Sequence, residues 1–118
     1  MLYMKKILLV EDSKEQALTI SRFLKNNNYI VLNAYDGKEA LLMLDSELPD
    51  IVILDYILPD CNGLEIAKYI KTNYQTFNLP ILIISANSGM EITKCDFLKK
   101  PFKLADLLNW IKNQYSVL

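Results

Sequence analysis

Short runs of apolar residues recur along this chain, and four of the five are followed by a segment with helical spacing. The apolar runs lie at residues 6–10, 29–35, 50–55, 80–85 and 97–98. Parallel strands need long crossover connections, usually helices, so this alternation favours a parallel sheet covered on both faces. Runs that are apolar throughout are typical of strands buried on both faces. The sequence therefore predicts an α/β fold with a doubly wound, five-stranded parallel sheet.

The segments after these runs carry apolar residues at every third or fourth position, as amphipathic helices do. The expected apolar stripes are Ala17, Ile20 and Leu24; Ala40, Leu41 and Leu44; Leu64, Ala67 and Ile70; and Leu104, Leu107, Leu108 and Ile111. Ser13 is a suitable N-cap for the first helix, and the asparagines at 26–28 suit its end. Pro49 closes the second helix, and Pro59 and Gly63 bound the loop before the third.

The overall composition limits the class of protein. The chain has 118 residues, of which 52% are hydrophobic, and its formal net charge is −1. We expect one domain over residues 1–118 without an output domain. The near-neutral net charge does not indicate direct binding to nucleic acid, which favours an excess of positive charge. No apolar run reaches the ~18 residues of a membrane span, and no signal peptide is visible. A cytoplasmic protein without a membrane partner is therefore expected.

Two residue types exclude whole classes of chemistry. The chain has no histidine, which removes histidine acid–base catalysis, Ser-His-Asp hydrolysis and histidine-ligated zinc. Cys61 and Cys95 form no CxxC pair, so we expect two reduced thiols.

Polar and charged residues stand where the predicted strands end. Glu11 and Asp12 follow the first strand, Asp55 ends the third, Ser85 ends the fourth, and Lys99 and Lys100 precede Pro101 after the fifth. These ends share one edge of a parallel sheet, where ligands bind in such folds. Two like charges ~4 Å apart cost about 4 kcal/mol at an effective dielectric constant of 20, so three carboxylates favour a divalent cation. Oxygen ligands suit Mg²⁺, and Mg²⁺ with a lysine would stabilise a bound phosphoryl group.

Each of these residues also has an ordinary structural interpretation. A single acid after a strand, such as Asp12, is more often a helix cap or a solvated turn residue. A lysine before a proline is usually on the surface, and Ser85 suits a turn. Compatible groups at four separate strand ends favour the functional interpretation.

Taken together, these residues resemble those of a response-regulator receiver domain, the phospho-accepting module of bacterial two-component signalling. The resemblance covers the whole chain. It rests on residues 7–12, 51–59, Gly63, 83–86 and 97–102. It implies a flavodoxin-like (receiver) fold that is phosphorylated by a sensor histidine kinase or a histidine phosphotransfer protein and signals to a protein output partner. Such a domain is not an enzyme beyond its own phosphotransfer and dephosphorylation.

The resemblance also assigns roles to individual residues. Asp55 matches the phosphoacceptor, Asp12 a direct Mg²⁺ ligand, Glu11 a ligand through water, and Ile57 the residue whose carbonyl binds the metal. Ser85 matches the hydroxyl that binds the phosphoryl group, Phe97 the aromatic residue of the switch, and Lys100, rather than Lys99, the family's lysine. By the same resemblance, the Lys100–Pro101 bond is expected to be cis.

The segment between Ser85 and Lys100 departs from the family pattern. It is shorter than usual by roughly two helical turns, so residues 87–96 are predicted to form a loop or about one to two turns of helix. A fourth helix that is short or missing would expose apolar surface for a partner or a homodimer. Trp110 lies off the apolar stripe of the last helix and is interpreted as flanking core, with a partner contact as the alternative.

Three other functions share the fold or the strand-end aspartate. A flavodoxin-like electron carrier needs a phosphate-binding loop where Glu11 and Asp12 stand. A phosphatase of the dehalogenase type needs a second aspartate where Ile57 stands. A degenerate receiver that serves only as an interaction scaffold remains the alternative, because of the short segment 87–96.

Overall fold

Five parallel strands form a single sheet in the computed structural model, which describes residues 3–73, 75–86 and 95–115. The strands are β1 (Lys6–Val10), β2 (Ile30–Ala34), β3 (Ile51–Asp55), β4 (Ile81–Ser85) and β5 (Asp96–Lys99). Their order in the sheet is β2-β1-β3-β4-β5, and every neighbouring pair is parallel. The predicted strand count and direction are therefore confirmed.

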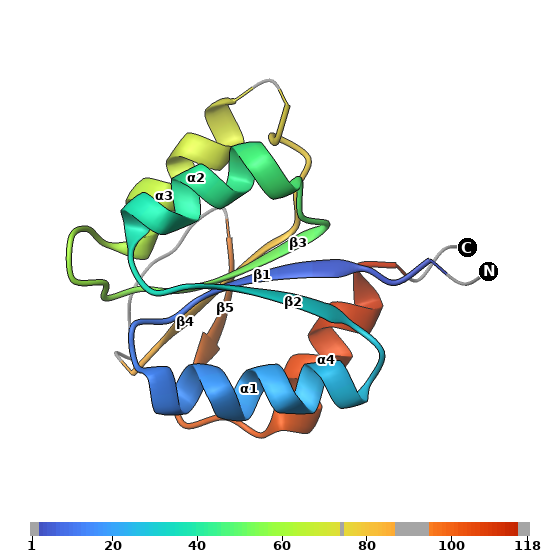
Figure 1. Ribbon diagram of the computed structural model, residues 1–118. Coiled ribbons are helices and arrows are strands. Elements are labelled where there is room, and N and C mark those ends of the chain that lie inside the picture. The colour runs from blue at the N-terminus through green and yellow to red at the C-terminus, as the bar shows by residue number, and fades with distance from the viewer. Residues whose placement is uncertain (1–2, 74, 87–94, 116–118) are drawn as a thin grey trace.

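Helices cover both faces of the sheet (Figure 1). The helices are α1 (Lys14–Asn26), α2 (Gly37–Glu47), α3 (Gly63–Thr72) and α4 (Leu104–Asn113). Helices α1 and α4 lie on one face, and α2 and α3 lie on the other (Figure 1). The chain is thus doubly wound, as the alternation of strands and helices predicts.

The strands divide their apolar side chains between two cores. In β1, Leu8 and Val10 pack with α2 and α3, whereas Ile7 and Leu9 pack with α1 and α4. All five residues of β3 and all five of β4 are buried. This two-sided burial is why the central strands are apolar throughout instead of alternating with polar residues.

Side-chain caps start the first three helices next to the carboxyl edge of the sheet. Ser13 Oγ accepts a hydrogen bond from the Gln16 amide, and Asp36 and Asn62 cap α2 and α3 in the same way. At the other end of α1, Asn28 adopts a left-handed conformation with a φ of 72°. The asparagines after α1 therefore end the helix as predicted.

The prediction for residues 87–96 falls mostly on 87–94, which lie outside the described residues. Of that segment, Cys95 and Asp96 are described, and Asp96 begins β5. Trp110 is half-buried against the α1–α4 core, and its Nε1 donates a hydrogen bond to Asp96 Oδ2 at 2.7 Å. The interpretation of Trp110 as flanking core is confirmed.

Two further expectations concern membranes and cysteines. Within the described ranges, no helix combines the length and apolar character needed to cross a membrane. Cys61 and Cys95 are both free thiols.

Candidate functional site

The sheet brings the predicted acidic residues together at its carboxyl edge. Val10 pairs with Leu54, so the residues that follow them, Glu11 and Asp55, emerge from adjacent strands. Carboxylate oxygens of Glu11, Asp12 and Asp55 lie within 4.8 Å of one another. Glu11 and Asp55 are buried, whereas Asp12 is exposed. The site therefore combines two buried carboxylates with one carboxylate that is exposed to solvent.

Lys100 reaches this site from the loop between β5 and α4. Its Nζ lies 2.8 Å from Glu11 Oε1 and 3.2 Å from Asp55 Oδ2, forming an ion pair with each. The preceding residue, Lys99, is exposed at the end of β5. The structure therefore places Lys100, and not Lys99, among the acids, as the family pattern implies. The Lys100–Pro101 bond is cis, as expected.

Burial and charge act against each other in this ion pair. Burial raises the pKa of the Glu11 carboxyl, and the hydrogen bond from Lys100 partly offsets that change. Burial lowers the pKa of the Lys100 ammonium, but the hydrogen bond to Glu11 and the charge of Asp55 together raise it above the ordinary value. The ammonium is therefore protonated at neutral pH and offsets part of the negative charge.

A third acceptor completes the surroundings of the ammonium, and the sequence interpretation missed it. Gln16 Oε1 accepts a hydrogen bond from Lys100 Nζ at 2.9 Å. Ser13 and Gln16 have the spacing of a capping box, in which the glutamine would turn back to the Ser13 amide. Here Glu11 Oε2 accepts the Ser13 amide instead, at 3.2 Å. The glutamine side chain is thereby available to Lys100, which no local sequence signal predicts.

The two switch residues predicted from the family lie on the neighbouring strands β4 and β5. Ser85 is buried at the end of β4, and its carbonyl oxygen accepts a hydrogen bond from the Lys100 amide at 2.8 Å. Phe97 is half-buried in β5 and packs against the α2–α3 core. Ser85 therefore lies next to Lys100, whereas Phe97 lies in β5, three positions before Lys100.

The loop from β3 to α3 carries the remaining predicted ligand and depends on a glycine. Ile57 is exposed and pairs with Asn62 across the loop. Gly63 starts α3 directly against the end of β3, and its amide donates to the Tyr56 carbonyl oxygen at 2.6 Å. A Cβ at Gly63 would lie 2.5 Å from the Asp55 carbonyl oxygen. The sequence shows Gly63 as a loop boundary and as part of the family pattern, whereas the close packing depends on the three-dimensional path of the loop.

The donor set fits a hard divalent cation. Three carboxylates supply oxygen ligands on one side, and exposed Asp12 leaves an open side for water or a phosphoryl group. Mg²⁺ prefers few protein carboxylates and retains several waters. The chemistry of the cluster therefore agrees with the predicted Mg²⁺ site.

A comparison with known families identifies this combination of fold and site. The family model described as the response regulator receiver domain matches residues 7–112. The chain belongs to this family. Receiver domains are signalling domains of two-component systems, bind Mg²⁺ at an acidic pocket and interact with histidine kinases and output domains. The resemblance stated from the sequence motifs is confirmed.

Individual relatives agree with the family. The chain is 40% identical over 116 residues to the response regulator ArlR of Staphylococcus saprophyticus, covering 92% of this chain and 51% of ArlR. It is 36% identical over 110 residues to the response regulator MprA of Mycobacterium ulcerans, covering 87% of this chain and 47% of MprA. The chain thus spans about half the length of these curated relatives.

The similarity extends to solved structures. The chemotaxis response regulator CheY4 of Vibrio cholerae superposes with a TM-score of 0.87 at 29% sequence identity. That match covers 94% of this chain and 98% of the CheY4 chain. The receiver fold is therefore shared over almost the full chain.

Proposed function

We propose that this chain is a phospho-accepting receiver domain that takes a phosphoryl group onto Asp55. The donor would be a phosphohistidine on a sensor histidine kinase or a histidine phosphotransfer protein. A carboxylate oxygen of Asp55 attacks phosphorus, the P–N bond to the donor breaks, and an acyl phosphate forms. The observation that carries the proposal is the placement of Lys100 Nζ between Glu11 and Asp55, beside exposed Asp12.

The residues around Asp55 have separate tasks in this reaction. Glu11, Asp12 and the Ile57 carbonyl would hold Mg²⁺ together with Asp55. When bound, Mg²⁺ supplies positive charge to the phosphoryl oxygens and lowers the repulsion between phosphate and carboxylates. Lys100 supplies a second positive charge from the other side. Its ammonium is already 3.2 Å from Asp55 Oδ2, so little movement is needed.

The signalling step would use Ser85 and Phe97. The Ser85 hydroxyl would bind the phosphoryl group, and Phe97 would change its packing on β5. A phosphoryl group can shift such an equilibrium only if it binds one arrangement better than the other. The readout would be a protein partner in the cytoplasm. The free thiols of Cys61 and Cys95 agree with a reducing compartment.

Intact mass after incubation with acetyl phosphate and Mg²⁺ tests the assignment of Asp55. The wild type is expected to gain one phosphoryl mass, and Asp55→Asn is expected to gain none, because the amide is not a nucleophile. Asp45→Asn is the matched control, since Asp45 is an exposed acid on α2 away from the site. Phosphorylation of Asp55→Asn to the wild-type extent would refute the proposal.

A further inference from the structure

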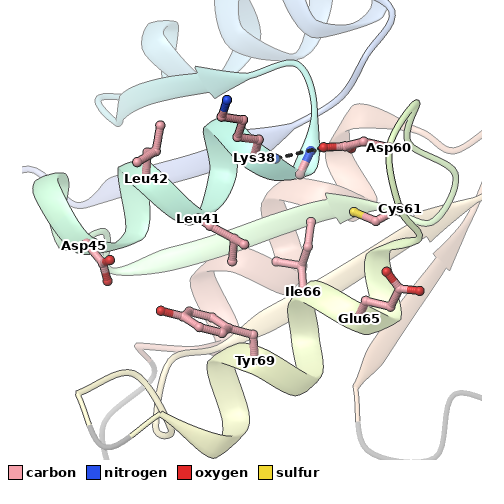
Figure 2. Close-up of a pocket in the computed structure, with 10 residues that line it drawn as sticks. Lys38, Leu41, Leu42, Asp45, Asp60, Cys61, Glu65, Ile66 and Tyr69 are labelled. Carbon is pink, nitrogen blue, oxygen red and sulfur yellow. Dashed lines mark hydrogen bonds between the residues drawn. The ribbon is translucent and has the colours of Figure 1, made fainter.

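A groove between α2 and α3 lies outside the phosphorylation site and is not used by the proposed reaction. Its accessible volume is about 470 Å³, enough for several side chains of a partner. Figure 2 shows Leu41 of α2 and Ile66 of α3 next to one another in the middle of the groove. Leu42 and Tyr69 add apolar surface, and Leu42 is 62% exposed. This is an open apolar surface on the helical layer.

Carboxylates stand at both ends of this apolar surface. Asp45 lies at one end, and Asp60 and Glu65 lie at the other (Figure 2). Among the described residues, none of these three acids forms an ion pair, and Lys38 is the one cation among the residues lining the groove. The lining therefore carries three carboxylates against one ammonium. Asp60 is hydrogen-bonded to backbone amides, but the excess of negative charge favours a cationic occupant.

The spacing of the two acidic ends sets the length of that occupant. Asp60 accepts hydrogen bonds from the amides of Gly37 and Lys38, at 2.8 and 3.0 Å, so it stands at the first turn of α2. Asp45 lies seven to eight residues further along the same helix. At a rise of ~1.5 Å per residue, the acidic ends are about 12 Å apart. Two turns of a second helix span the same distance, and they place residues i and i+7 on one face.

We propose that the α2–α3 groove is a docking site for an amphipathic helix of a partner protein. The helix would carry lysine or arginine at positions i and i+7 and apolar side chains at i+3 and i+4. Its cations would meet Asp45 at one end and Glu65 with Asp60 at the other. Its apolar residues would cover Leu42 and Tyr69. The groove is present in the unphosphorylated chain, so the test uses that form.

A synthetic peptide with this pattern tests the proposal on the full chain. The probe is a 14-residue helical peptide, about four turns long, with arginines at i and i+7 and leucines at i+3 and i+4. Two control peptides keep the leucines and either replace the arginines by glutamates or move them to adjacent positions. In ¹⁵N-labelled protein, only the probe is expected to shift the amide signals of Leu41, Leu42, Ile66 and Tyr69.

Matched variants distinguish binding of the probe in the groove from nonspecific binding to exposed apolar side chains. Leu42→Ser is expected to weaken probe binding about tenfold, because one large apolar side chain is lost from the interface. Leu18→Ser is the control, since Leu18 is 51% exposed on α1 and does not line the groove. Both substitutions are on exposed helix surfaces, and a preserved amide spectrum shows that the variants are folded.

The charge contribution has its own variant pair. Asp45→Asn with Glu65→Gln is expected to weaken binding several-fold and to reduce its salt dependence, because charge pairs between exposed groups are screened. Glu15→Gln with Glu47→Gln removes the same charge at residues that do not line the groove and should leave binding unchanged. Asp60 is kept, since its carboxylate accepts hydrogen bonds from the Gly37 and Lys38 amides at the start of α2.

Three results would overturn the proposal. The first is that the probe causes no shifts in the groove at millimolar concentration. The second is that the glutamate peptide binds equally well. The third is that the groove amides shift with protein concentration alone, which would assign the surface to a second copy of this chain.

Discussion

At the scale of single residues, the site depends on how one ammonium group is shared. Lys100 Nζ has three acceptors, on Glu11, Asp55 and Gln16, and an ammonium has three protons to donate. Glu11 is 1% exposed, so its charge depends on this partner. Lys100 therefore has a structural task in addition to its proposed role in phosphoryl transfer, and substitution should separate the two.

Replacing Lys100 tests the structural task. In Lys100→Ala, the buried Glu11 carboxylate loses its partner, and we expect the free energy of unfolding at pH 7 to fall by about 2 kcal/mol. This is less than the value of about 3–5 kcal/mol for a fully buried pair, because the lysine is partly exposed. Lys99→Ala should change it by less than about 0.5 kcal/mol. Urea denaturation in metal-free buffer measures both variants.

The pH dependence of the same variant follows from the Glu11 pKa. Without Lys100, burial and the charge of Asp55 remain, and both raise the pKa of Glu11. A carboxyl whose folded-state pKa is raised binds its proton more tightly in the folded protein. The loss of unfolding free energy in Lys100→Ala is therefore largest at pH values above the pKa of Glu11 in the folded variant. This loss becomes smaller as the pH falls toward the ordinary pKa range of glutamate. A cost that grows on acidification would contradict this account.

At the scale of elements, the junction of β3 with α3 controls where Asp55 stands. The helix begins one loop after the strand and returns directly against the strand end, with the Gly63 amide bonded to the Tyr56 carbonyl. The approach leaves no room for a side chain at Gly63. The Asn62 cap at 3.0 Å starts the helix at this point. Backbone packing, rather than side-chain contacts, therefore positions Asp55.

A methyl group at Gly63 should disturb this junction. In Gly63→Ala, the new Cβ would meet the Asp55 carbonyl oxygen at 2.5 Å, and backbone must move. We expect a loss of about 2 kcal/mol in the free energy of unfolding, within the range for overpacking, and slower phosphorylation by acetyl phosphate. Thermal unfolding and a time course of intact mass measure the two effects.

Gly37→Ala is the matched control at the start of α2. There the nearest atom is Cys61 Sγ, the end of a side chain that can rotate, followed by Asp60 Oδ1 at 3.2 Å, and no backbone atom is among the nearest neighbours. Alanine also favours a helix over glycine by about 1 kcal/mol. Gly37→Ala should therefore cost clearly less than Gly63→Ala. Equal costs would show that the backbone contact at Asp55 is not the cause.

At the scale of the whole molecule, the acidic edge is a source of instability that a cation can relieve. Three carboxylates lie within 4.8 Å of one another, and a single lysine forms ion pairs with two of them. Two apolar cores, one on each face of the sheet, stabilise the fold that holds these carboxylates together. A ligand that binds only the folded protein raises its stability in proportion to the logarithm of its concentration.

Mg²⁺ should therefore stabilise the folded protein. At a concentration about 100 times the dissociation constant, the expected gain is about 2.7 kcal/mol. Asp12→Ala should lose most of the gain, because it removes one oxygen ligand, whereas Glu15→Ala should keep it. Thermal unfolding at increasing Mg²⁺ concentrations, with chelator as the zero point, measures the effect. A stabilisation by Mg²⁺ that survives in Asp12→Ala would remove Asp12 from the metal site.

Much of this protein follows from its sequence alone. The apolar runs and the helical stripes predict five strands in a parallel sheet and the helices of both layers, because burial periodicity and caps depend on near neighbours. The sequence also predicts which charged residues gather at one site, because the carboxyl ends of parallel strands share an edge of the sheet. These residues are Glu11, Asp12, Asp55 and Lys100. The choice of Lys100 over Lys99 came from the family pattern, and the structure explains it by the exposure of Lys99.

Only the tertiary structure decided how the remaining groups are used. The spacing of Ser13 and Gln16 suggests a capping box, but Glu11 takes the Ser13 amide, and Gln16 turns to a lysine 84 positions away. Gly63 is a loop residue in the sequence and a point of backbone contact in the fold. The acid-flanked groove arises where α2 and α3 lie side by side. Such contacts join groups far apart in the chain, so their geometry is determined by how whole elements pack, which local patterns do not encode.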